Sequence, residues 1–170
     1  MGLGLKFNRL RTVCVAPDHP VLCGFVLVWT LPRIPEVHGT WRRIQLGVKK
    51  STEGEEVGYV FGDAMVDLGI SVLSDWKGCT PEAVQACCPD RVRDEEVAGM
   101  RALLAEQALT EYPMLPDVLV DLVGNSALFR AVVQQIGVEA SEAIKVVNAL
   151  KEAQKNDSSS GAPGAAPEAA

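Results

Sequence analysis

The chain has 170 residues, of which 48% are hydrophobic and only 5% are aromatic. This length fits one domain with appendages and can bury a sizeable core, which must be mainly aliphatic. No apolar run reaches the roughly 20 residues that a membrane-spanning helix needs. The longest run, 21–31, also lacks a small-residue cleavage site, so neither a membrane span nor a secretory signal is expected.

The net charge of −6 is unevenly distributed along the chain. Residues 1–50 hold eight basic and two acidic residues, whereas the remainder holds eight basic and twenty acidic residues. This asymmetry indicates either a partner surface or an internal match between a basic sheet and an acidic bundle. Nucleic-acid binding is disfavoured, because the basic residues do not cluster on a helix face and no stacking aromatics accompany them.

The five cysteines are odd in number and form no C-x-x-C pair. Reduced thiols that serve as small hydrophobic residues are the expected state. A zinc site built from His19, Cys23 and His38 is the alternative, but it lacks the paired short spacing of such sites. We therefore expect no metal and no cofactor.

The first third of the chain has strand character. The run 25–31 is rich in β-branched and aromatic residues, and 41–48 alternates apolar and polar positions. An antiparallel pair joined around 35–39 is predicted from them, and 12–15 is a further short strand candidate. Residues 1–50 are thus expected to form an N-terminal β segment.

Helical periodicity begins near residue 55. One continuous helix over 57–76 is predicted from apolar positions that share one stripe: Val57, Phe61, Ala64, Met65, Leu68, Val72 and Trp76. Gly78 is expected to end it in a left-handed conformation. Asp63, Asp67 and Asp75 are expected on its solvent face.

Five further helices are expected. The first begins with Thr80 as N-cap and Pro81 at the first helical position, and ends at Pro89. The second spans 94–110, with Val97, Met100, Leu104 and Ala108 facing inward. The third covers 116–123.

A break at Gly124-Asn125 and a cap at Ser126 should follow that third helix. The next helix should then carry Leu128 and Ile136 and stop at Gly137. The last is expected over 140–154, where it buries Ala143, Ile144, Val147 and Leu150. The fold class is therefore α+β: a small N-terminal antiparallel β segment, a helical bundle over 55–156 and a disordered C-terminal tail over 157–170.

No catalytic motif is present. The sequence lacks a phosphate-binding glycine loop, G-x-S-x-G and H-E-x-x-H, and its only histidines are His19 and His38. We therefore expect a protein that is not an enzyme. The candidate partner-binding residues are apolar or aromatic side chains on the helix stripes, for each of which a core position is the alternative: Trp76, Phe129, Val132 and Val133.

Four features give the chain a family resemblance over about residues 20–156. They are the N-terminal β segment, the helix ending Asp75-Trp76-Lys77-Gly78, the Thr80-Pro81-Glu82 helix start and the helical close at Lys155-Asn156. In this order they resemble the tail assembly chaperones of long-tailed bacteriophages. Residues 1–20 and the cysteine-rich stretch 79–88 depart from that pattern.

The resemblance implies a non-catalytic holdase. Such a protein binds the tape measure protein, keeps it soluble and helps to recruit tail tube subunits. It acts in the host cell cytoplasm, is absent from the mature virion and can form homo-oligomers. The competing interpretations are a structural head–tail or tail protein of the virion, and a small nucleic-acid-binding or regulatory module that uses the basic N-terminal third.

Overall fold

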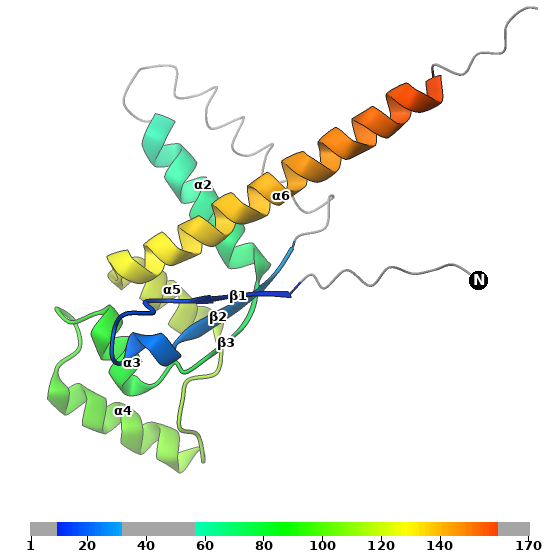
Figure 1. Ribbon diagram of the computed structural model, residues 1–170. Coiled ribbons are helices and arrows are strands. Elements are labelled where there is room, and N and C mark those ends of the chain that lie inside the picture. The colour runs from blue at the N-terminus through cyan, green and yellow to red at the C-terminus, as the bar shows by residue number, and fades with distance from the viewer. Residues whose placement is uncertain (1–9, 32–56, 160–170) are drawn as a thin grey trace, which may run out of the picture.

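The computed structural model describes residues 10–31 and 57–159, which form an α+β arrangement of the expected class (Figure 1). The sheet contains strands β1 (Leu10–Cys14), β2 (Val26–Thr30) and β3 (Leu73–Lys77). A short 3-10 turn, η1 (Leu22–Gly24), precedes β2. The helices are α2 (Val57–Val72), α3 (Pro81–Cys87), α4 (Asp94–Glu106), α5 (Pro116–Asn125) and α6 (Ala127–Ser159).

The sheet has the order β1-β2-β3, and both neighbouring pairs are antiparallel. The strands predicted at 12–15 and 25–31 are confirmed as β1 and β2, and Cys14 lies opposite Val26. The predicted strand 41–48 and its connection at 35–39 lie outside the described residues.

The prediction of one helix over 57–76 is wrong at its C-terminal end. The helix ends at Val72, and the following residues form β3, which pairs with β2 and places Trp76 opposite Leu27. A stripe of apolar residues cannot reveal this change, because Trp76 is buried in either conformation. Gly78 is left-handed as expected, with φ of 73°, but it follows a strand instead of capping a helix.

The helix stop predicted at Gly137 is also wrong, because α6 runs without a break from Ala127 to Ser159. Helices α2 and α6 cross (Figure 1), and a Cβ at Gly137 would lie 1.9 Å from the carbonyl oxygen of Met65 on α2. The glycine therefore permits close helix contact. The helix also extends three residues into the predicted tail, and residues 160–170 lie outside the described part.

The helix starts predicted at Thr80 and Ser126 are observed, whereas the separate start predicted at residue 140 is wrong, because α6 is continuous there. The Thr80 hydroxyl accepts a hydrogen bond from the backbone N–H of Ala83 at 3.2 Å, and the Ser126 hydroxyl accepts one from Phe129 at 3.1 Å. These are N-cap contacts, which satisfy backbone donors in the first turn.

Helix α4 is shorter than the predicted 94–110. It ends at Glu106, and Ala108 is exposed with φ of 55°. Val97 and Leu104 are buried as expected, while Met100 is half-buried. In the last predicted helix, Ile144 is buried and Ala143 is half-buried, and the side chains of Val147 and Leu150 lie outside the described part.

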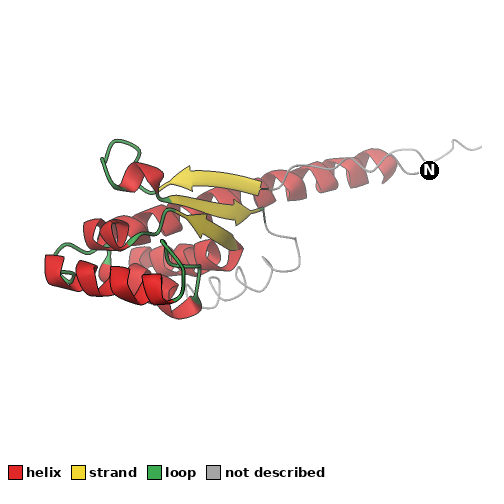
Figure 2. Cartoon of the chain, turned by 90° about the horizontal axis from the view of Figure 1, so that it is seen from below, coloured by secondary structure: helices red, strands yellow, loops and turns green. Residues whose placement is uncertain are grey.

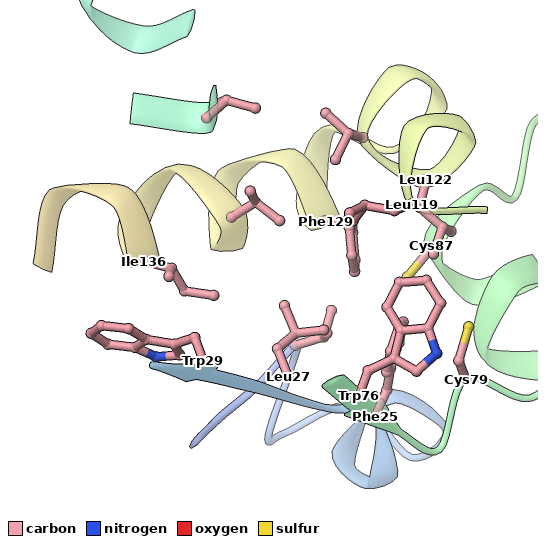
Figure 3. Packing of buried hydrophobic residues seen from close by; sticks show 14 of the residues in the cluster. Phe25, Leu27, Trp29, Trp76, Cys79, Cys87, Leu119, Leu122, Phe129 and Ile136 are labelled. Carbon is pink, nitrogen blue, oxygen red and sulfur yellow. The ribbon is translucent and has the colours of Figure 1, made fainter. Parts of the chain in front are cut away.

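The sheet lies on one side of the helices (Figure 2) and shares a single core cluster with them. In the alternation of β2, Leu27 and Trp29 are buried and Val26 and Val28 are half-buried. Figure 3 shows the buried face of β2 packed against Phe129 and Ile136 of α6. The β segment and the helices are thus held together by common apolar burial.

Asp63, Asp67 and Asp75 are expected on the solvent face of one helix, and only Asp67 is found there. Asp63 is half-buried and forms an ion pair with Arg130, which joins α2 to α6. Asp75 is exposed but lies on β3, where its Oδ1 accepts a hydrogen bond from the N–H of Trp76 at 2.8 Å. Asp67 is exposed on α2. Within residues 10–31 and 57–159, no helix is long and apolar enough to span a membrane.

Candidate functional site

A pocket of about 370 Å³ lies between α3, α4 and α5. We call it the α3–α5 pocket. Apolar side chains from all three helices and from the two connecting segments form most of its lining: Val84, Val92, Met100, Tyr112, Val118 and Leu122. The polar lining residues Arg91, Asp121 and Asn125 are exposed, and Cys88 is buried. This combination of apolar walls and a few polar groups is typical of binding sites.

A tight turn holds the edge of the pocket between α3 and α4. The N–H groups of Arg91 and Val92 both donate to the carbonyl oxygen of Cys88, at 3.0 Å. Helix α4 then begins with a bond from the backbone N–H of Arg93 to Glu96 Oε2 at 2.7 Å. These contacts fix the direction in which α4 leaves the turn, and therefore the width of the pocket.

Trp76 holds the segment that carries the pocket residue Tyr112. Its indole Nε1 donates a hydrogen bond to the carbonyl oxygen of Tyr112 at 2.7 Å, and the N–H of Tyr112 donates to Cys79 O at 2.8 Å. The N–H of Gly78 also donates to Glu111 Oε2 at 2.7 Å. The segment that carries Tyr112 is thus fastened to the end of β3, and Trp76 is a positioning residue for this wall.

Three of the four candidate partner-binding residues lie in the core. Trp76 is 3% exposed, and Phe129 and Val133 are fully buried. Trp76 and Phe129 form an aromatic cluster with Phe25 (Figure 3), with ring centroids 5.7 to 6.3 Å apart. A partner cannot reach side chains that are buried to this extent. Val132 is half-buried and packs against the same cluster.

The pocket residues were not identified from the sequence. Met100 is expected to face inward, and the apolar lining residues of α3 and α5 lie at positions that a helical pattern assigns to an ordinary core: Val84, Val118 and Leu122. The available signal in the sequence is the pair of prolines, Pro113 and Pro116, that interrupts the helical pattern after residue 110, since the segment before Pro116 brings Tyr112 to the pocket wall.

The residues of the proposed zinc site have other contacts. Nδ1 of His19 accepts hydrogen bonds from the N–H groups of Val21 and Leu22, each at 3.2 Å, and Cys23 Sγ lies 3.5 Å from the carbonyl oxygen of Pro20. His38 lies outside the described residues. The described residues contain no group of three or more His, Cys, Asp or Glu side chains placed to hold a metal.

The thiols near the pocket are kept protonated. Burial, followed by the charge of Cys87, raises the pKa of Cys79 from 9.0 to about 12. Burial, followed by the charge of Cys88, raises the pKa of Cys87 to about 11. Burial and the nearby Asp121 also raise the pKa of Cys88. Since the thiolate is the nucleophilic form, these cysteines are poor nucleophiles at neutral pH.

These shifts predict a loss of stability in alkali. Above pH 9.0 the unfolded chain releases the Cys79 proton, while the folded chain keeps it up to about pH 12. The stabilisation is therefore complete below pH 9 and falls by at most ~1.4 kcal/mol per pH unit as the pH rises. Urea unfolding at pH 8, 9 and 10 under reducing conditions measures this slope.

Cys79→Ala should reduce the alkaline slope, to which Cys87 and Cys88 still contribute, and Cys23→Ser, which changes an exposed thiol, is the control that should leave it unchanged. Parallel pH profiles for the wild type and Cys79→Ala would contradict the assignment.

No known protein family, curated protein or solved structure matches this chain.

Proposed function

We propose that this protein is a non-catalytic binding protein that holds an apolar helical segment of a partner in the α3–α5 pocket. The pocket itself carries the proposal: its lining is mainly apolar, and its polar lining residues Arg91, Asp121 and Asn125 are exposed. An amphipathic helix docks in such a groove by inserting a few side chains from one face. A volume of about 370 Å³ is near the lower limit for ligand sites, roughly 300 Å³, and suits one or two large apolar side chains.

The sequence resemblance supplies the identity of the partner in this proposal. The client is the tape measure protein of a long-tailed bacteriophage, and the protein acts as a tail assembly chaperone in the host cell cytoplasm. It holds the client soluble, recruits tail tube subunits and is left out of the finished virion. An acidic surface supports this role, since net charge opposes association of the loaded complexes.

Co-expression tests the proposal. The tape measure protein should move from the insoluble to the soluble fraction when this chain is produced with it, and the two proteins should co-purify. A client that stays aggregated would overturn the chaperone role. Recovery of this chain at stoichiometric levels in purified virions would favour the structural alternative.

A matched pair of substitutions on α5 locates the activity. Val118 lines the pocket and is half-buried, whereas Val120 is 63% exposed and does not line it. Val118→Glu should reduce the soluble client at least tenfold, because it places a charge against apolar walls. Val120→Glu should leave the yield unchanged, and equal yields from both variants would exclude the pocket as the client site.

A further inference from the structure

Two charged side chains of the α3–α5 pocket form no ion pair with any residue in the described ranges 10–31 and 57–159. Arg91 and Asp121 both line the pocket, both are exposed, and neither belongs to an ion pair within the described residues. A second hollow, of about 300 Å³, lies between α3 and α4. Its charged lining residues, Glu82 and Arg101, form an ion pair with each other. The α3–α5 pocket therefore retains charges that a partner can neutralise.

The segment 81–125, which supplies the lining of the pocket, is strongly acidic. Residues 81–125 contain nine acidic and three basic residues. One of the three basic residues, Arg101, is already paired with Glu82. Asp90, which precedes Arg91 in the sequence, is exposed as well. A partner of positive charge is therefore favoured by the net charge of this segment, which increases both the association rate and the specificity.

We infer that the partner segment is a basic amphipathic helix. Its apolar anchor enters the α3–α5 pocket, and a Lys or Arg one turn away pairs with Asp121, since residues three or four apart lie on the same helix face. A single carboxylate elsewhere on the same helix pairs with Arg91, which belongs to the turn after α3 whereas Asp121 belongs to α5, and this second contact sets the direction of the helix. This inference rests on the proposed function and adds to it the charge and the orientation of the client segment.

Two synthetic helices serve as the probe. Both are 18-residue peptides, on the order of five helical turns, with the same Leu and Trp face; one carries Lys and the other Glu at the polar positions. Fluorescence anisotropy of the labelled peptides should show the Lys peptide binding at least tenfold more tightly than the Glu peptide. Equal affinities would overturn the inference.

Charge reversal at the pocket gives the decisive comparison. Asp121→Lys should abolish or reverse the preference for the Lys peptide. Asp67→Lys makes the same change on α2, away from the pocket, and should preserve it. Both aspartates are exposed, so neither change removes a buried group, and thermal melting checks that both variants fold. If the Asp121→Lys variant preferred the Lys peptide as strongly as the Asp67→Lys variant does, the binding site would lie elsewhere and the inference would be overturned.

The remaining outcomes separate this inference from the proposed function. A tape measure protein solubilised equally by the wild type and Asp121→Lys would overturn the inference and leave the chaperone role intact. A client that stays aggregated with the wild type, combined with a clear Lys-peptide preference, would overturn the chaperone role only. A dimer in sedimentation that Asp121→Lys disperses would assign the pocket to a second copy of the chain and overturn the inference.

Discussion

Trp76→Ala should lower the free energy of unfolding by ~3–5 kcal/mol, as expected for a large buried aromatic side chain. The indole is 3% exposed and packs edge-on against Phe25 and Phe129, with centroid distances of 5.8 and 6.3 Å. Its removal leaves a cavity between the sheet and α6. It also leaves the carbonyl oxygen of Tyr112 without its indole donor.

Trp76→Phe separates these two contributions. Phenylalanine keeps most of the apolar burial but cannot donate to Tyr112, so the expected loss is ~1–3 kcal/mol. Leu103→Ala, at a side chain that is 59% exposed on α4, is the control and should change stability by less than ~0.5 kcal/mol. Urea unfolding measures all three variants. If Trp76→Ala matched Trp76→Phe, the aromatic packing would contribute little.

Gly137→Ala should destabilise the protein by ~3 kcal/mol although alanine is the better helix former. A Cβ at position 137 would lie 1.9 Å from Met65 O, and one at position 69 would lie 2.0 Å from Val133 O. Each glycine thus faces the backbone of the opposite helix where α2 and α6 cross. A backbone cannot move aside as a flexible side chain can, so the helices must separate and lose contact along both of them.

Two glycines elsewhere provide matched controls. A Cβ at Gly62, also on α2, would meet only the end of Gln134 at 3.7 Å, and one at Gly99 on α4 would meet nothing within 4 Å. Alanine at either position should raise stability by up to ~1 kcal/mol through helix propensity. Circular dichroism during urea unfolding gives the ranking, and a Gly137→Ala protein as stable as Gly99→Ala would show that the two helices are less closely packed.

Local chemistry in the sequence was sufficient for many element boundaries. Thr80 and Pro81 define a helix start because their side chains act within one turn, and Ser126 does the same for α6. The alternation within β2 follows from one buried and one half-buried face. The acidity of residues 81–125 is likewise a property of the sequence alone.

Tertiary structure decided the features that depend on contacts between distant segments. Residues 73–77 form a strand because β2 offers them hydrogen bonds, and Gly137 remains helical because α2 packs directly against it. The α3–α5 pocket arises in the same way. Val84, Met100 and Val118 come from three helices and have the pattern of ordinary core residues. The hollow between them depends on the spacing of these helices, which the hydrogen bonds around Tyr112 fix in part. Apolar periodicity specifies which face of a helix is buried, but it does not specify how completely neighbouring faces fill the space between them.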